Sequence, residues 1–221
     1  MIGSETSECR SFSHNSSRER DRIVHLTTVH HAFDPRIFHK QLGTLSDAGF
    51  DTHLVVPHHT SESRQETEIH ALPVSERRSQ RILLQPRMWS LAQALEGDLY
   101  QIHDPELIPL AFLLRKGSDA RIIYDMHENY VSKGPLLGRG LRSLEKWCFK
   151  WIDHVLLAEK SYAAVLTGLD VPFTLVENYF KPFDSNPSHS AQEVTARPLN
   201  LLYTGTISKR RGLETMIDLA C

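Results

Sequence analysis

The stretch Leu99–Tyr130, LYQIHDPELIPLAFLLRKGSDARIIYDMHENY, predicts a strand, a helix and a second strand. Leu99–Ile102 is a short apolar run, and apolar residues then recur at helical spacing over Leu107–Leu114. Asp104 stands where a helix N-cap is expected, and Arg121–Met126 is the next predicted strand. Two strands joined by one helix make a βαβ unit, in which the strands run parallel.

Polar residues follow each strand of this unit at the point where the strand ends. His103 comes directly after the first strand, and His127 and Glu128 come directly after the second. Because the strands are parallel, these residues lie at one edge of the sheet, where open α/β sheets bind their ligands. This edge is therefore the predicted functional site. Asp104 and Glu106, in contrast, are interpreted as the cap and a first-turn residue of the helix.

Strands and helices alternate along the rest of the chain, which predicts an α/β fold with a doubly wound parallel sheet. The further strands are expected at Ile23–Val29, Thr52–Val56, Ile69–Val74, Val155–Ala158, Thr174–Val176 and Leu199–Tyr203. The further helices are expected at Asp34–Gly49, Arg77–Glu96 with a break at Pro86, Leu141–Ile152, Tyr162–Leu166 and Leu213–Ala220. The segment His58–Glu66 is interpreted as a polar loop.

The composition divides the chain into four parts. Residues 1–21 are rich in Ser, Glu and Arg and are interpreted as a disordered tail. Residues 22–180 form the first domain, and residues 181–198, which contain several prolines and few apolar residues, form a linker. Residues 199–221 begin a second domain, which we expect to be truncated because a typical domain needs on the order of 100 residues.

The overall composition excludes several classes of protein. Hydrophobic residues make up 40% of the chain and the net charge is −2, which gives no case for nucleic-acid binding. No apolar run approaches the roughly 18 residues of a membrane span, and no signal-peptide core is visible. The 3 cysteines lie far apart and suggest neither disulfides nor a zinc site, so we expect a cytoplasmic protein without a metal. The absence of G-x-G-x-x-G, P-loop and G-x-S-x-G motifs argues against a dinucleotide oxidoreductase, an NTPase and a serine hydrolase.

The crossover after the first strand, HHAFDPR, carries four candidate site residues: His30, His31, Asp34 and Arg36. Asp34 followed by a proline is typical of a helix N-cap. Arg36 is a candidate for binding an anionic acceptor or a diphosphate.

Four segments together resemble the family 4 retaining glycosyltransferases of the GT-B fold, the group 1 enzymes that build bacterial polysaccharides. They are HHAFDPRIFHK, QIHDPELIPLAFLL, IIYDMHENY and LLYTGTISKRRGLETMI, which begin at residues 30, 101, 122 and 201. The resemblance implies two Rossmann-like domains across a cleft, the first holding the acceptor and the second most of the donor. His30, His31, Asp34, Arg36 and His103 would then lie on the acceptor side.

The resemblance also implies roles for single residues. His127, with Glu128 beside it, matches the histidine near the transferred sugar and is the catalytic candidate. Gly205, Arg211 and Gly212 match the turn glycine and the basic residue and glycine that contact the donor diphosphate.

The chain departs from the family pattern at three places. Many members have a Gly-Gly pair where this chain has His30 and His31, and many have Arg in place of Thr206. The family's E-x7-E donor motif would lie beyond Cys221.

The resemblance implies hexosyl transfer from a UDP- or GDP-linked sugar to a glycan or lipid-linked acceptor, with no cofactor besides this nucleotide-sugar. We expect the 221-residue chain alone not to transfer sugar, because most of the donor domain is missing. A separately encoded donor domain would make it one half of a split enzyme. The alternatives are a non-catalytic module that binds a glycan or a partner subunit, and a sugar-nucleotide epimerase of the same fold.

A basic face is expected on the helix at Leu141–Ile152, formed by Arg139, Arg142, Lys146 and Lys150. A solvated helix face is the simpler interpretation of such a pattern. The alternative is peripheral docking on anionic lipid at the inner membrane face, to which each cation contributes roughly 1 kcal/mol.

Overall fold

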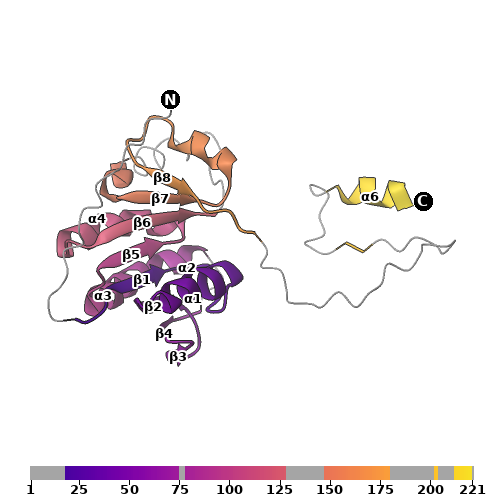
Figure 1. Ribbon diagram of the computed structural model, residues 1–221. Coiled ribbons are helices and arrows are strands. Elements are labelled where there is room, and N and C mark those ends of the chain that lie inside the picture. The colour runs from indigo at the N-terminus through magenta and orange to yellow at the C-terminus, as the bar shows by residue number, and fades with distance from the viewer. Residues whose placement is uncertain (1–17, 75–77, 128–146, 180–201, 204–211, 221) are drawn as a thin grey trace. The chain divides into compact units, whose positions relative to one another are not determined.

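The computed structural model describes residues 18–74, 78–127, 147–179, 202–203 and 212–220 (Figure 1). The chain divides into two units, Met1–Tyr179 and Phe180–Cys221. The first unit holds an eight-stranded sheet, and helix α6, Leu213–Ala220, belongs to the second.

The sheet has the strand order β3-β4-β2-β1-β5-β6-β7-β8. Its strands are β1 Arg22–Leu26, β2 Asp51–Pro57, β3 Glu62–Arg64, β4 Thr67–Leu72, β5 Leu99–Ile102, β6 Arg121–Met126, β7 His154–Leu157 and β8 Phe173–Leu175. Every pairing is parallel except that of β3 with β4. The chain runs outward from β1 through β2 to β4 and then returns to the other side of β1 at β5. The strand order therefore reverses between β1 and β5.

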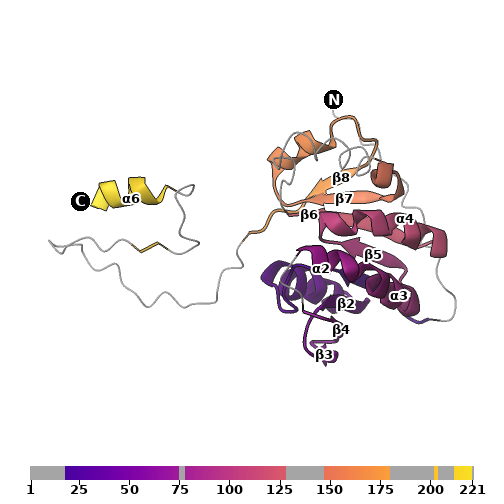
Figure 2. The same ribbon diagram turned by 180° about the vertical axis from the view of Figure 1, so that it is seen from behind.

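Helices cover both faces of the sheet. They are η1 Pro35–Leu42, α1 Gly43–Asp47, α2 Arg78–Leu83, α3 Gln85–Leu95, η2 Pro105–Leu107, α4 Ile108–Gly117, η4 Phe149–Trp151 and η5 Lys160–Leu166. The segment from η1 to α1 packs on the face that Figure 1 shows in front, whereas α3 and α4 pack on the face seen from behind in Figure 2. This arrangement confirms the predicted doubly wound α/β fold.

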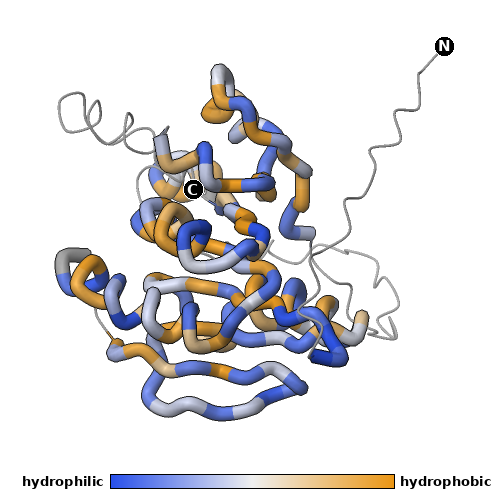
Figure 3. Tube along the Cα trace, turned by 90° about the vertical axis from the view of Figure 1, so that its left-hand side faces the viewer, coloured by the Kyte–Doolittle hydropathy of each residue, from blue (hydrophilic) through white to orange (hydrophobic). Residues whose placement is uncertain are grey.

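The strands supply side chains to two apolar layers in turn. In β2, Val55 belongs to the layer under α3 and α4, whereas Leu54 and Val56 belong to the layer under η1. Successive side chains of a strand point to opposite faces, so a strand buried on both faces must be apolar at nearly every position. Figure 3 shows the resulting hydrophobic segments, which are interrupted by hydrophilic ones along the chain.

Two local predictions have opposite outcomes. The break at Pro86 is confirmed, because this proline lies in the first turn of α3. The loop predicted at His58–Glu66 is wrong, because Glu62–Arg64 forms β3 and pairs antiparallel with β4. Gln65 and Glu66 make the tight turn between these strands with positive φ angles of 49° and 58°. Neither residue type signals such a turn, since glycine and asparagine are the usual residues there.

Several sequence predictions concern residues at the margins of the described ranges. Arg18, which the sequence assigns to the polar tail, donates to the carbonyl oxygen of Glu96 at 2.6 Å. Of the four cations predicted for lipid docking, Lys150 is described and exposed, whereas the other three lie outside the described residues. Lipid docking therefore stays a prediction. Among the described residues, no helix is both long enough and apolar enough to cross a membrane.

Gly97 occupies a position that leaves no room for a side chain. A Cβ atom there would lie 2.8 Å from Cγ2 of Val24 and 3.1 Å from the ring of Tyr100. We expect Gly97→Ala to lower the free energy of unfolding by about 1–3 kcal/mol, as overpacking of a core does. Urea denaturation measures this change.

Gly43→Ala is the matched control for this prediction. The nearest atom to a Cβ at Gly43 is 3.7 Å away, and alanine in a helix is favoured over glycine by up to about 1 kcal/mol. The control should therefore be at least as stable as the wild type. Equal stability of Gly97→Ala and the wild type would contradict the packing described here.

Candidate functional site

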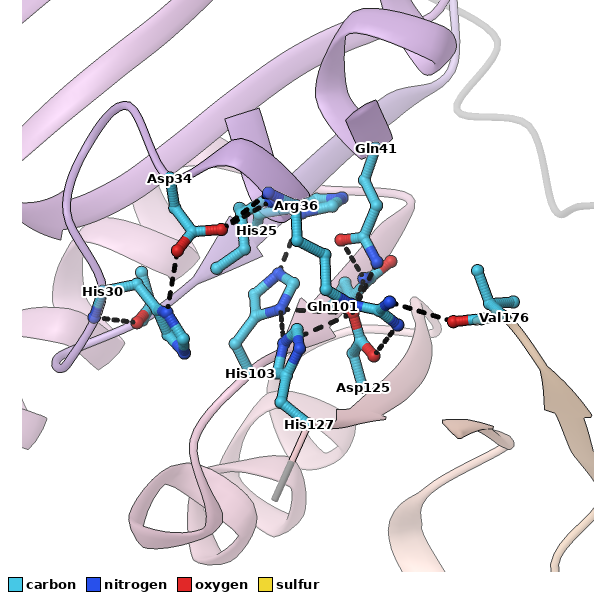
Figure 4. A network of polar contacts seen from close by, with 12 residues as sticks. His25, His30, Asp34, Arg36, Gln41, Gln101, His103, Asp125, His127 and Val176 are labelled. Atoms are coloured by element: carbon cyan, nitrogen blue, oxygen red, sulfur yellow. Dashed lines mark hydrogen bonds and ion pairs between the residues drawn. The ribbon is translucent and has the colours of Figure 1, made fainter. Parts of the chain in front are cut away.

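Polar residues gather where the strand order reverses, at the carboxyl ends of β1, β5 and the neighbouring β6. Open α/β sheets bind ligands at such a reversal. This edge is therefore the candidate site (Figure 4). The residues that follow the three strands there are Thr27, Thr28, His30, His103, Asp104 and His127.

A polar layer inside the sheet supports this edge. His25, Gln101 and Asp125 are buried within β1, β5 and β6. Their strand neighbours on either side include residues of the apolar layer under α3 and α4, so these three side chains point to the opposite face, toward η1. His103 and His127 continue the same alternation one position beyond their strands.

Asp125 is the centre of this layer, and its side chain is 0% exposed. Nη2 of Arg36 donates to Oδ1 of Asp125 at 2.8 Å, and Nε donates to Oδ2 at 3.3 Å. The side-chain amides of Gln41 and Gln101 also donate to Oδ2. Nη1 of Arg36 donates to the carbonyl oxygen of Val176 at 2.9 Å. A carboxylate can be buried in this way only because charged and polar donors surround it.

The start of η1 positions Arg36 against the face of the sheet to which Asp125 points. Oδ1 of Asp34 accepts hydrogen bonds from the backbone N–H groups of Arg36 at 2.8 Å and Ile37 at 3.0 Å, which confirms the predicted N-cap. The helix that follows has the wide π-type turn, a form that is frequent at functional sites. In this position the side chain of Arg36 is only 8% exposed.

Three histidine rings form a hydrogen-bonded chain across the strand ends. Nδ1 of His25 lies 2.9 Å from Nε2 of His103, and Nδ1 of His103 lies 3.0 Å from Nε2 of His127. Oδ2 of Asp125 lies 3.5 Å from that nitrogen of His103 and 3.4 Å from that of His127. Figure 4 shows the rings of His103 and His127 beside Asp125.

Burial determines the charge of the His25 and His127 rings. Burial lowers the pKa of His127 to about 3, which outweighs the opposite effect of the Asp125 carboxylate. Burial likewise lowers the pKa of His25 well below its ordinary value of 6.5. For Asp125, burial alone raises the pKa, but hydrogen bonds and attraction from His103 and Arg36 hold it far below its usual range. At neutral pH the site thus combines the buried carboxylate of Asp125 with the neutral imidazoles of His25 and His127.

A second set of contacts joins the ends of β1 and β5. Oδ2 of Asp104 accepts hydrogen bonds from the hydroxyl of Thr27 at 3.0 Å and from the backbone N–H of Thr28 at 2.5 Å. Asp104 stands at the N-cap position of η2, as predicted, but its carboxylate makes no side-chain hydrogen bond to the helix start and binds the residues after β1 instead. These contacts also turn the chain after Leu26, which ends the first strand earlier than the sequence predicts.

His30 lies between two carboxylates at the solvent side of the cluster. Its Nδ1 is 3.3 Å from Asp34, and its Nε2 is 3.8 Å from Asp104. Burial lowers the pKa of His30, but the hydrogen bond to Asp34 and the nearby negative charges outweigh burial, so the pKa lies above 6.5. His30 therefore holds a proton more readily than His25 or His127.

The structure brings together His30, Asp34, Arg36, His103 and His127 of the residues predicted for the site. His31, next to His30 in the chain, is exposed. Glu128, Gly205 and Arg211 lie outside the described residues. Gly212 precedes α6 in the other unit, with a positive φ of 74°. The roles assigned to all these residues stay predictions.

Sequence reasoning does not find the supporting residues His25, Gln41, Gln101 and Asp125. A signal for three of them is present in the segments IVHL, LYQIH and IIYDMH, where polar residues interrupt strands that ought to be apolar throughout. Asp125 is the clearest case, because aspartate is depleted in strands. Gln41 carries no such signal, since a glutamine on a helix is unremarkable.

Comparisons with known proteins find one family profile and several solved structures to which this chain is similar. The sequence profile of the glycosyl transferase 4-like domain family matches residues 36–177. No curated protein sequence matches the chain. Among solved structures, sucrose-phosphate synthase from Thermosynechococcus elongatus is similar at 15% identity and a TM-score of 0.57, over 72% of this chain and 48% of that one.

Two further structures are similar to parts of the chain. A shorter structure of the same synthase matches at 15% identity and a TM-score of 0.55, over 72% of this chain and 90% of that one. The α,α-trehalose 6-phosphate synthase from Burkholderia multivorans matches at 11% identity and a TM-score of 0.44, over 67% of this chain and 41% of that one. The chain thus spans about half the length of the first synthase, and the likeness to the synthase at these identities is one of fold.

The buried ion pair gives a test of stability. Asp125→Asn keeps the shape of the side chain but leaves Arg36 buried without a counter-charge. We expect the free energy of unfolding to fall by about 3–5 kcal/mol, measured by urea denaturation at pH 7. Asp51→Asn is the matched control, because Asp51 pairs with Arg22 at 2.7 Å but its side chain is 32% exposed. The control should cost about 1 kcal/mol or less.

We also expect Asp125→Asn to change how the free energy of unfolding depends on pH in the acid range. Because the folded pKa of Asp125 lies below the ordinary 3.8, its contribution to stability is complete above pH 3.8 and is lost as the pH falls through the folded value. The free energy of unfolding should therefore fall less steeply between pH 5 and pH 2 in Asp125→Asn than in the wild type. Equal slopes, or equal losses in Asp125→Asn and Asp51→Asn, would contradict this account of the ion pair.

Proposed function

Because the chain belongs to the glycosyl transferase 4-like domain family, we propose that the edge of β1, β5 and β6 is one half of a sugar-transfer site. The sheet is the N-terminal half of a GT-B fold, and a donor domain faces it in the complete enzyme. The reaction is transfer of a hexosyl group from a UDP- or GDP-linked sugar to a hydroxyl of a glycan or lipid-linked acceptor. The configuration at the anomeric carbon is retained.

The state of His127 is the observation that carries this proposal. Its Nε2 faces His103 at 3.0 Å, whereas its Nδ1 makes no hydrogen bond to any other described residue. The side chain is 13% exposed, and burial lowers its pKa to about 3. A neutral imidazole with one nitrogen available, held at the tip of a strand, can form a directed hydrogen bond with a sugar hydroxyl.

The contacts around His127 suggest a separate role for each residue of the site. When Nε2 of His127 accepts a hydrogen bond from the Nδ1–H group of His103, Nδ1 of His127 carries the one proton of the neutral ring and donates to a hydroxyl of the bound hexosyl group. Arg36 acts indirectly, because it holds Asp125 and so fixes the rings of His103 and His127. His30 and His31 face the acceptor, and His30 is the cation available to an anionic one.

The donor diphosphate is bound from the second domain in this proposal. Gly205 and Gly212 let the backbone approach the phosphates, and Arg211 balances the negative charge that grows on the leaving diphosphate. Glu128, next to His127, completes the group nearest the transferred sugar. A helix N-terminus such as that of α6, Leu213–Ala220, favours negative charge.

Substitution of His127 tests the proposal. In the enzyme completed with a donor domain, His127→Ala should lower the rate of sugar transfer per folded molecule about 100-fold or more. The assay measures transfer from UDP- and GDP-sugars to an acceptor glycan, with the folded fraction determined by circular dichroism. We expect a nearly unchanged melting temperature.

His154→Ala is the control, because His154 lies on the neighbouring strand β7 and its Nε2 contacts only the hydroxyl of Thr174 at 2.8 Å. Transfer by this variant should match the wild type. A large loss of stability in His127→Ala, with an unchanged rate per folded molecule, would assign His127 a structural role and contradict the proposal.

A further inference from the structure

Three potential ligand atoms converge at the end of β5 and β6. Nδ1 of His103 and Nε2 of His127 lie 3.0 Å apart, and Oδ2 of Asp125 lies 3.5 Å from the first and 3.4 Å from the second. From this geometry we propose that His103, Asp125 and His127 bind a divalent transition-metal ion of the Zn²⁺ type. The proposal does not rest on sugar transfer, because it concerns only these three side chains.

The size of this triangle fits a metal ion. Zn²⁺ binds imidazole nitrogen and carboxylate oxygen at about 2.0–2.2 Å, and in tetrahedral geometry two such ligands lie roughly 3.3–3.5 Å from each other. The three separations of 3.0, 3.4 and 3.5 Å are close to this value. Little rearrangement of the rings is therefore needed to place an ion at equal distance from all three atoms.

The tautomers of the two rings also suit a metal. Nε2 of His103 lies 2.9 Å from Nδ1 of His25, so a proton on Nε2 of His103 has an acceptor. With that proton in place, Nδ1 of His103 presents a lone pair to the site, as a metal ligand must. A ligand histidine usually donates its other N–H to a fixed acceptor in this way, and the acceptor here is His25.

Hydrogen bonds from neighbouring side chains fix the Asp125 carboxylate, as they do for carboxylates that bind a metal ion. Nη2 of Arg36 donates to Oδ1 of Asp125 at 2.8 Å and fixes the orientation of the carboxylate. Oδ2 accepts from Gln41, and at the longer distance of 3.3 Å from Gln101 and from Nε of Arg36, so a metal ion on Oδ2 replaces these two longer bonds. The positive charge of Arg36 disfavours a second cation, so Asp125 alone does not compensate a divalent ion. An anionic or polarisable oxygen in the fourth position, from water or from a bound ligand, supplies the remaining charge.

The ligand set indicates which cation binds. Two imidazoles and one carboxylate suit Zn²⁺, Co²⁺ or Fe²⁺, whereas Mg²⁺ and Ca²⁺ prefer oxygen ligands throughout. Three protein ligands leave a fourth position for water or a bound ligand, and of the three only His127 has exposed side-chain surface, at 13%. The alternative explanation for the same distances is a proton shared between the two rings, which needs no metal.

Metal binding to the 221-residue chain separates these explanations. The chain is stripped with a chelator, dialysed against Co²⁺ or Zn²⁺, and measured for bound metal by elemental analysis and for Co²⁺ by its visible spectrum. We expect one equivalent of metal, with the intense visible bands of four-coordinate Co²⁺ and displacement of Co²⁺ by Zn²⁺. Because the chain has 13 histidines, stoichiometry and variants must identify the site.

His127→Ala should weaken Co²⁺ binding at least 100-fold and abolish the four-coordinate spectrum. His70→Ala is the matched control, because Nε2 of His70 lies 2.9 Å from Nδ1 of His53, an equally close pair. Among the described residues that pair has no third ligand, and Asp51 contacts the other nitrogen of His53 at 3.1 Å. The control should bind Co²⁺ as the wild type does.

Two results would overturn the proposal. One is a wild-type chain that takes up less than a tenth of an equivalent of Zn²⁺ and Co²⁺, which would leave the shared proton as the explanation. The other is equal binding by the wild type and His127→Ala, which would place the metal elsewhere. Both measurements are made without sugar or nucleotide, so this proposal and the proposed transfer reaction can fail independently.

Discussion

The ion pair of Asp125 with Arg36 is the interaction on which the candidate site depends. It joins the middle of the sheet to η1, and the same guanidinium reaches the backbone after β8 at Val176. Removing two charges from water is costly, so the pair persists only because Gln41 and Gln101 complete its hydrogen bonds. The carboxylate fixed in this way then orients the histidine rings at the strand ends. A polar layer inside a buried sheet is thus the support of the site.

The fold was predictable where the spacing of apolar residues and the residues at caps and turns indicate the same element. The βαβ unit from Leu99 to Met126 follows from apolar runs of strand and helix length, and the cap at Asp34 follows from an aspartate before a proline. The hairpin of β3 was not predictable, because Gln65 and Glu66 adopt the left-handed conformation without the residues that favour it. Asp104 shows a further limit, since its long-range partners on β1 outcompete the local helix start.

The location of the site was predictable from the sequence, but the hydrogen bonds between its residues were not. Residues just beyond parallel strands meet at one edge, which is why His103 and His127 could be placed together from the sequence. The hydrogen-bonded chain to His25, and the meeting of two histidines with Asp125, depend on strand order and on which face each residue occupies. A search for metal-ligand spacing in the sequence misses such a set, because its members come from two strands separated by a helix. The membership of the glycosyl transferase 4-like domain family gives this edge its proposed role in sugar transfer.

Burial holds the rings of His25 and His127 neutral within the hydrogen-bonded network, against the opposite effect of the Asp125 carboxylate. The most direct measurement is a pH titration of the histidine rings by ¹⁵N–¹H correlation NMR between pH 8 and pH 4. We expect His25 and His127 to stay neutral over this range, since the pKa of His127 is lowered to about 3, whereas His30 gains its proton above pH 6.5. Titration of His127 near pH 6.5, the ordinary value, would show that burial does not control the charge of this ring.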